Sequence, residues 1–158
     1  MTQRITPFLW FDTQAEEAMH FYVSVFKNSR VGSITRYGAA GPGPEGSVMT
    51  CTFELEDQEF VALNGGPHYA FSPAISFVVN CATQDEVDEL WEKLSAGGKP
   101  VQCGWLTDRF GVSWQIVPSV LGHLLNDPDS AKSQRVMRAM LGMTKLDIAA
   151  LQYACERP

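Results

Sequence analysis

Apolar and polar positions follow the same order in two halves of the chain. An apolar run at Pro7–Phe11 precedes Thr13-Gln14-Ala15-Glu16, and a second run at Ile75–Val79 precedes Thr83-Gln84-Asp85-Glu86. Both four-residue units fit a capping box, in which Thr accepts a backbone N–H and Glu reaches back to the cap residue. Beyond each unit the apolar positions recur every three to four residues, which predicts a strand followed by a helix in each half.

Each predicted helix has one apolar face, which we expect to pack on a sheet. The apolar positions are Ala15, Ala18, Met19, Tyr22 and Phe26 in the first helix and Val87, Leu90, Trp91 and Leu94 in the second. After each helix the apolar period changes to two, which predicts strands at 31–37, 48–55, 59–64, 101–106 and 112–117. Each half therefore has the order strand, helix, three strands.

Strand alternation predicts two rows of side chains on the sheets. Matching the turn residues Asp57 and Asp108 sets Asn64 opposite Gln115. One row is then apolar and lies beneath the helices, and the other is small or polar. The apolar row is Val61, Leu63, Val112, Trp114 and Ile116, and the polar row is Ala62, Asn64, Ser113 and Gln115, with Ser76 joining it from the strand at 75–79.

A sheet with a small, polar face predicts a cup that binds a small molecule. The alternative is that this face packs against another subunit. Trp10 and Trp105 are candidate walls of the cup, because indole offers a flat apolar surface and one donor. One alignment of the first strand places Phe8 and Trp10 in the cup, whereas another buries them under the helix. His68, at the predicted rim, is the one nearby base we nominate as a catalytic group.

The charge balance limits the partners. The chain has 12 basic and 18 acidic residues and a net charge of −6, which disfavours nucleic acid as the main partner. No apolar run is long enough to cross a bilayer, and the first residues do not have the pattern of a signal peptide. The four cysteines form no CxxC pair and are interpreted as reduced thiols. We therefore expect a cytoplasmic protein that contacts neither nucleic acid nor membrane.

The last 29 residues differ from the rest in charge. Residues 1–129 hold 7 basic and 16 acidic side chains, whereas residues 130–158 hold 5 and 2. Helical periodicity at Ser130–Met143 and Leu146–Tyr153 predicts a C-terminal helical extension over 126–158. This extension is either a solvated tail or a segment that docks on an acidic surface of its own or a partner subunit.

Three segments resemble the PhnB-like family, whose members often carry the name demethylubiquinone methyltransferase domain. They are PFLWFDTQAEEAMHFY, ALNGGPHYAFSPAISF and CGWLTDRFGVSWQIVP. That family belongs to the vicinal oxygen chelate superfamily, with glyoxalase I and bleomycin- and fosfomycin-resistance proteins. The resemblance implies an α+β fold in which two paired βαβββ modules, at about 4–66 and 72–118, form a cupped mixed β-sheet within a 1–125 domain. It also implies a homodimer.

The resemblance also defines where a metal is expected in relatives, and this chain departs from that pattern. The usual ligands are His and Glu of the first and last strands of each module. Here Ala74 stands at the start of the fifth strand, no His lies between Ile5 and Asp12, and the last-strand positions hold Asn64 and Gln115. Neutral amides without imidazole make a poor transition-metal site. We therefore expect no resident cofactor or metal, with room only for a weakly held divalent cation.

The leading functional hypothesis is a small-molecule-binding protein or enzyme of the vicinal oxygen chelate type that lacks the standard metal site. The alternative is a non-enzymatic sequestering protein of the resistance type. Methyl transfer follows only from the customary family name and is least favoured, because no glycine-rich strand-to-helix turn is present to hold S-adenosylmethionine. The Gly41–Gly46 stretch matches GxGxxG by letter, but it is interpreted as a hairpin loop between two strands.

Overall fold

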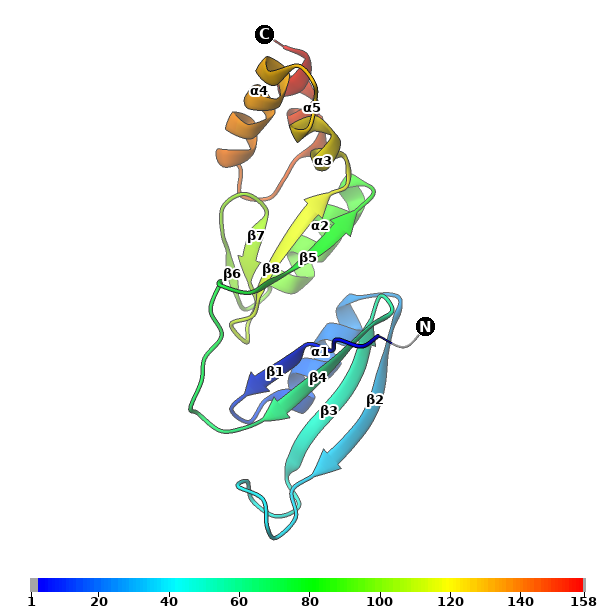
Figure 1. The fold of residues 1–158 in the computed structure, drawn as a ribbon, viewed down its shortest axis with the longest axis vertical. Helices are drawn as coiled ribbons and strands as arrows, with labels where there is room; N and C mark the ends of the chain where they lie inside the picture. Colours follow the sequence, from blue (N-terminus) through cyan, green and yellow to red (C-terminus); the bar gives the residue numbers. More distant parts are fainter. Residues whose placement is uncertain (1–2, 158) are drawn as a thin grey trace. The chain divides into compact units, whose positions relative to one another are not determined.

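The computed structural model describes residues 3–157 and divides the chain into two compact units between Phe71 and Ser72. Unit 1 contains β1 (Phe8–Phe11), α1 (Ala15–Val25), β2 (Ser29–Arg36), β3 (Val48–Leu55) and β4 (Gln58–Asn64). Its sheet has the order β1-β4-β3-β2, with β1 parallel to β4 and the other pairs antiparallel. Helix α1 lies against one face of this sheet (Figure 1).

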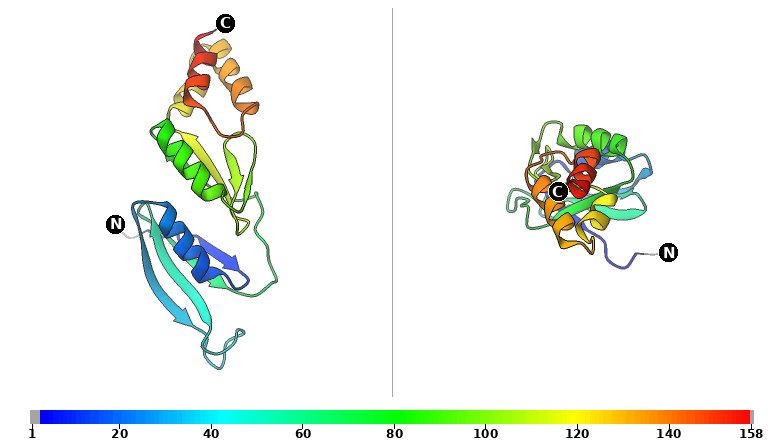
Figure 2. Two further views of the ribbon diagram at one scale, coloured as in Figure 1. Left: turned by 180° about the vertical axis from the view of Figure 1, so that it is seen from behind. Right: turned by 90° about the horizontal axis from the view of Figure 1, so that it is seen from above.

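Unit 2 repeats this topology. It contains β5 (Ser76–Cys81), α2 (Gln84–Ser95), β6 (Lys99–Pro100), β7 (Trp105–Thr107) and β8 (Ser113–Pro118), in the sheet order β5-β8-β7-β6. The strands β5 and β8 are parallel, and α2 covers one face (Figure 2). Three helices follow: α3 (Val120–Leu125), α4 (Ser130–Leu141) and α5 (Ile148–Glu156). The predicted repeat of strand, helix and three strands, and the α+β class with mixed sheets, are thus confirmed.

The predicted strand boundaries hold better in unit 1 than in unit 2. The strand predicted at 48–55 is β3, whereas the strand predicted at 101–106 is wrong in extent. That segment turns at Cys103 and Gly104, whose φ angles are +61° and +83°, and so it separates the short strands β6 and β7. Two consecutive left-handed residues cannot continue a strand.

The predicted apolar helix faces are buried. All five positions of the first helical pattern, from Ala15 to Phe26, are at most 5% exposed. The Tyr22 ring lies 6.0 Å from Phe53, which in turn lies 5.4 Å from Phe60, so α1 packs on an aromatic layer from β3 and β4. In unit 2, Val87 and Leu94 of α2 are fully buried and the other two predicted positions are half-buried.

The side-chain rows are predicted correctly in unit 2 and wrongly in unit 1. Trp114 and Ile116 are buried, as expected. In β4, however, Phe60 and Ala62 are buried on the α1 side, so Val61 and Leu63 lie on the opposite face. The cause is turn length: two residues, Glu56 and Asp57, join β3 to β4, whereas five residues, 108–112, join β7 to β8. Matching the two aspartates therefore shifts one strand by an odd number of residues, which exchanges its faces.

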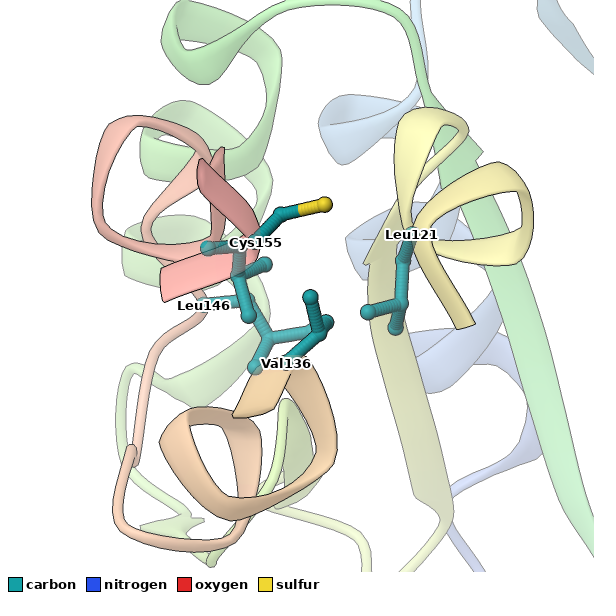
Figure 3. Packing of buried hydrophobic residues seen from close by; sticks show 5 residues of the cluster. Leu121, Val136, Leu146 and Cys155 are labelled. Carbon is teal, nitrogen blue, oxygen red and sulfur yellow. The ribbon is translucent and has the colours of Figure 1, made fainter. Parts of the chain in front are cut away.

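The C-terminal extension docks on unit 2. Its helices α4 and α5, together with α3, enclose a cluster in which Leu121 of α3, Val136 of α4, Cys155 of α5 and Leu146 converge (Figure 3). The N–H groups of Cys103 and Gly104 donate to the carbonyls of Met143 and Thr144, each at 2.8 Å. Of the two alternatives, these contacts match the docked segment and not the freely solvated tail.

Side chains of α2 hold the same segment. The Gln84 amide accepts from the Ile148 N–H at 2.8 Å and donates to the Leu146 carbonyl at 3.1 Å. Lys145 lies 2.8 Å from Asp88, and its hydrogen bond lowers the pKa of that carboxyl group below its usual value. The basic extension therefore meets the acidic α2 of its own unit, one of the surfaces considered above. No helix within residues 3–157 combines the length and apolarity that a bilayer crossing requires.

Candidate functional site

The face of the unit 2 sheet opposite α2 carries most of the predicted site residues. Ser76 pairs with Ser113, and Trp105 pairs with Gln115, so these four side chains share the face that Trp114 and Ile116 do not occupy. The Gln115 Nε2 donates to the Ser76 Oγ at 2.9 Å. Ser113 is 2% exposed, whereas the other three are half-buried.

This arrangement suits recognition of an uncharged polar group. The hydrogen bond from the Gln115 Nε2 to Ser76 fixes the amide plane of Gln115. The Oε1 of the same amide makes no hydrogen bond within residues 3–157. An amide oxygen accepts one or two further hydrogen bonds, and the neighbouring indole of Trp105 offers apolar surface and a donor. We call Ser76, Trp105, Ser113 and Gln115 the unit 2 polar row.

Trp10 lies on the corresponding open face of unit 1. It pairs with Leu63, while Leu9 and Phe11 are buried on the α1 side and Phe8 is 59% exposed. Of the two registers that the sequence left open, the structure therefore has the one in which Phe8 and Trp10 point away from the helix. The Trp10 Nε1 donates to the Gly66 carbonyl at 2.9 Å, which holds the indole over the chain that follows β4.

Two neighbours fix the Trp10 ring further. A Cβ atom on Gly65 would lie 2.3 Å from the indole, so only glycine fits beneath it. The Tyr69 ring stands almost perpendicular to the indole, at 83° and 5.0 Å between centroids. Trp10 and Tyr69 therefore form a corner of two aromatic rings.

Asn64 does not occupy the position that the sequence suggested. It lies on the same side of β4 as Ala62, facing α1, because Ala62 is fully buried and side chains alternate. Its Oδ1 accepts from the Ala15 N–H at 2.8 Å, and its Nδ2 donates to the Val48 carbonyl at 3.2 Å. The predicted polar row that joins Asn64 to Gln115 is thus wrong, and both amide atoms of Asn64 serve the fold of unit 1.

The contacts of Asn64 also correct the first capping box. The N-cap of α1 is Gln14, without a side-chain hydrogen bond, and Asn64 supplies the acceptor from β4 instead of Thr13. The Thr half of the second capping box is confirmed, since the Thr83 Oγ1 accepts from the Glu86 N–H at 3.2 Å. Glu86 in turn accepts from the Ala82 N–H, one residue before the cap.

His68 is exposed in the segment that follows β4. No hydrogen bond or ion pair of its side chain occurs in the part of the chain that the structure describes. Its catalytic role remains a prediction.

Two of the cysteines are buried thiols that are not activated as nucleophiles. All four are free, and burial raises the pKa of the Cys51 thiol and raises that of Cys81 to about 11. These two thiols stay protonated at neutral pH, and the thiol form is a weak nucleophile.

The sequence analysis did not predict the structural contacts of two residues. Asp108 is buried and accepts from the N–H groups of Phe110 and Val112 and from the indole of Trp114, at 2.8, 3.0 and 2.9 Å. Tyr37 donates to the Asn64 carbonyl at 2.5 Å, and its ring leaves no room for a Cβ atom on Gly41 or Gly43. The GxGxxG match is therefore a hairpin loop around Tyr37, as interpreted, and the aromatic residue just before the glycine-rich stretch is a signal that was available.

The donor chemistry at the predicted metal positions does not fit a tightly held ion. Within residues 3–157, no three His, Cys, Asp or Glu side chains are grouped so as to hold a metal. Asn64 has both amide atoms engaged, and the unit 2 polar row offers one amide and hydroxyl groups without imidazole or carboxylate. Such neutral donors compete poorly with water for a divalent cation.

Comparisons with known proteins agree with this fold. Residues 3–117 match the family described as 3-demethylubiquinone-9 3-methyltransferase. A solved structure of a putative 3-demethylubiquinone-9 3-methyltransferase, a PhnB protein from Bacillus cereus, is 41% identical, with a TM-score of 0.68. That match covers 74% of this chain and 100% of the other. No curated protein gives a significant match.

Two more distant structures share the fold alone. Protein PA1353 from Pseudomonas aeruginosa is 21% identical with a TM-score of 0.62, covering 74% of this chain and 98% of its own. The fosfomycin resistance protein FosX from Listeria monocytogenes, solved with Mn(II) and sulfate, is 12% identical with a TM-score of 0.51. This match covers 75% of this chain and 90% of FosX.

Proposed function

The chain belongs to the PhnB-like family described as 3-demethylubiquinone-9 3-methyltransferase, within the vicinal oxygen chelate superfamily, and from this premise we propose that it binds a small organic molecule on the open face of the unit 2 sheet. The observation that carries the proposal is the unit 2 polar row. A half-buried amide, oriented by a hydroxyl and lying beside an indole, is the combination of polar and apolar groups that small-molecule sites use.

The ligand that this row fits is uncharged at the point of contact. The Gln115 oxygen accepts a hydrogen bond from a hydroxyl or amide group, and Trp105 covers an adjacent planar or apolar portion. Neither a cationic nor an anionic group finds an opposite charge within the four residues of the row. Recognition therefore rests on hydrogen bonds and apolar contact.

A second candidate function, sequestration without turnover, is favoured by the same chemistry. None of the four row residues titrates near neutral pH, so the row itself supplies no general acid or base. If the protein is instead an enzyme, His68 is the group we nominate.

Methyl transfer, which the family name suggests, has no support in the strand-to-helix connections. The residues between β1 and α1 are Asp12, Thr13 and Gln14, and those between β5 and α2 are Ala82 and Thr83. Neither connection contains the glycines that let a backbone approach a bound nucleotide closely.

The test is a binding screen read by tryptophan fluorescence on protein without an affinity tag. For a ligand found in a library of neutral aromatic amides and alcohols, Gln115→Ala should weaken binding about tenfold by loss of an oriented hydrogen bond. Trp105→Phe should remove most of the quenching. Gln134→Ala, an exposed amide on α4, and Trp91→Phe on α2 are the matched controls.

Two outcomes would contradict the proposal: no ligand in the library, or a ligand whose affinity is the same in Gln115→Ala as in Gln134→Ala. Mass spectrometry of the bound ligand after incubation separates turnover from sequestration. A converted product that forms with the wild type but not with His68→Ala would establish an enzyme.

Two wider expectations belong to the same proposal. We expect a homodimer, which light scattering would reveal as twice the chain mass of 17.5 kDa. We also place the protein in the cytoplasm, because four unpaired cysteines suit a reducing compartment.

A further inference from the structure

Unit 1 carries a hollow that the proposed function does not use. Its volume is about 440 Å³, and it lies over β2, β3 and β4. Its lining includes Arg30, Gly32, Thr52, Glu54 and Glu59. Phe53 faces α1, so Thr52 and Glu54 point to the open side, and Glu59 and Arg30 each pair with Glu54 across the strands. The hollow therefore opens on the sheet face that carries Trp10.

The hollow holds one carboxylate in excess. Arg30 forms a close ion pair with Glu54, and the two charges offset each other. The backbone N–H of Glu59 donates to Gln3 and its carbonyl accepts from Gln58, whereas its exposed carboxylate has no partner within residues 3–157. This leaves one negative charge beside the hydroxyl of Thr52. A carboxylate and a hydroxyl oxygen are acceptors, which match the N–H groups of an ammonium ion.

The backbone keeps the floor of the hollow open. Strand β2 has an irregular register between Val31 and Ile34, and a Cβ atom on Gly32 would lie 2.2 Å from the Thr52 Oγ1. The Ser33 N–H donates to that oxygen at 2.8 Å, which fixes the hydroxyl in place. Any larger residue at position 32 would displace Thr52, so the bulge and the glycine together position this acceptor.

The same sheet face becomes apolar on the other side of the hollow. Thr52 pairs with Val61, and Val61 pairs with Phe8, whose side chain is 59% exposed. Two strand spacings separate β3 from β1, which is about 10 Å. Beyond Phe8 on the same strand lies the corner of Trp10 and Tyr69. An acidic hollow and an exposed aromatic surface thus lie within the length of one small molecule.

We infer that unit 1 binds an organic ammonium ion, with its charged nitrogen at Glu59 and Thr52 and its apolar body across Val61 onto Phe8. This inference goes beyond the proposed function, since it names a second ligand class, for the open face of the other unit. At one end of the ligand, the ammonium charge pairs with the Glu59 carboxylate. At the other end, the aromatic face of Phe8 favours contact with a cation or a flat ring. A neutral or anionic analogue of the same shape loses the first of these contacts.

The test is calorimetric titration with 4-phenylbutylammonium at low salt, because four methylene groups separate its nitrogen from its ring. Glu59→Gln should weaken binding about tenfold, since a hydrogen bond to a charged group is lost. Phe8→Ala should weaken it about fivefold by loss of apolar contact. Glu17→Gln on α1 makes the same change in net charge on an exposed residue and should leave the affinity within about twofold.

All three substituted side chains are exposed, and thermal unfolding should show that the variants remain folded. The inference is overturned if 4-phenylbutanol binds as tightly as the amine, if the amine does not bind, or if Glu59→Gln and Glu17→Gln behave alike. These results differ from a failure of the proposed function. That failure appears as the absence of any ligand sensitive to Gln115 and Trp105, whatever happens at Glu59.

Discussion

Helices α1 and α2 occupy the same place in two units of identical strand order, but their N-termini are capped in different ways. Thr83 caps α2 from the residue next to the helix, at 3.2 Å from the Glu86 nitrogen. Asn64 caps α1 from the end of β4, 49 residues away in sequence. The same helix–sheet arrangement is therefore secured by a local contact in one unit and by a long-range contact in the other.

The equivalent end position in unit 2 explains the difference. Asn64 is paired with Phe11 at the end of β1 and β4, and Pro118 is paired with Cys81 at the end of β5 and β8. Proline has no side-chain acceptor, so α2 depends on its own Thr83. Unit 1 thus uses its strand-end amide for stability, whereas unit 2 keeps its amide, Gln115, on the open face. Equivalent topology does not imply equivalent use of polar residues.

Among the variants proposed here, Asn64→Ala should have the largest effect, because it removes the long-range cap of α1. The variant leaves the Ala15 N–H and the Val48 carbonyl without their partners, and we expect unfolding free energy to fall by about 2–4 kcal/mol. Urea unfolding measures this loss. Asn64→Asp keeps the acceptor at the helix N-terminus and should recover part of it. A loss below about 1 kcal/mol for Asn64→Ala would show that Asn64 is not the principal cap.

Gly104→Ala should have the next largest effect, through the extension on unit 2. Its φ is +83°, and a Cβ atom would lie 2.9 Å from Leu146 and 3.0 Å from the Ile116 carbonyl. We expect a loss of about 2–3 kcal/mol from backbone strain and steric overlap. Gly46→Ala has a similar φ of +85° with nothing nearby, so it should cost only the strain, about 1 kcal/mol. If thermal unfolding shows the same loss of stability for Gly104→Ala and Gly46→Ala, Leu146 of the extension does not restrict the space beside Gly104.

Thr83→Ala tests the local cap of α2. Loss of the local cap should lower stability by about 1 kcal/mol. The matched change Thr13→Ala, at the corresponding position before α1, should have an effect near zero because Thr13 does not cap that helix. Denaturant midpoints of the two variants measure the difference. If Thr13→Ala is the more damaging change, the assignment of caps is incorrect.

Lys145→Ala should have the smallest effect, a few tenths of a kcal/mol, because the pair with Asp88 is about half exposed. Lys145 lowers the pKa of Asp88 from its usual 3.8, so the pair stabilises the folded state above that pH. The contribution is lost as pH falls through the lowered value. The difference in melting temperature between wild type and variant should therefore be present at pH 7 and absent near pH 2. If the difference in melting temperature does not depend on pH or salt, Lys145 stabilises the protein through packing and not through its charge.

The parts of the fold that sequence predicts are those set by short-range periodicity. The buried face of α1 repeats every three to four residues and β3 alternates along its length, so the face of α1 and the limits of β3 were both predicted. The prediction of which β4 side chains face α1 was wrong, because Glu56 and Asp57 make a two-residue turn whereas the loop at Asp108 is longer. A turn residue identifies where a strand begins but not which side its first residue faces.

The candidate site was predictable only in part, for a related reason. Gln115 and Ser76 were placed on one face by alternation, Trp105 was nominated separately as a wall of the cup, and the register of unit 2 brings the three together. Asn64 has the same residue chemistry, but its role depends on an N–H group that is near in space and distant in sequence. The Glu59 hollow was missed because its lining comes from three strands and a bulge, which no periodic pattern reveals.

The packing of the C-terminal segment against the residues around Gly104 limits where this protein can be shortened. The family match ends at residue 117, and the Bacillus cereus relative is matched over its whole length by 74% of this chain. Trimming to that length would leave the Gln84 amide and two backbone N–H groups to water, and would bare the apolar surface beneath Leu146. The edge of a family alignment is thus not a safe place to cut, because here it runs through the interior of a folded body.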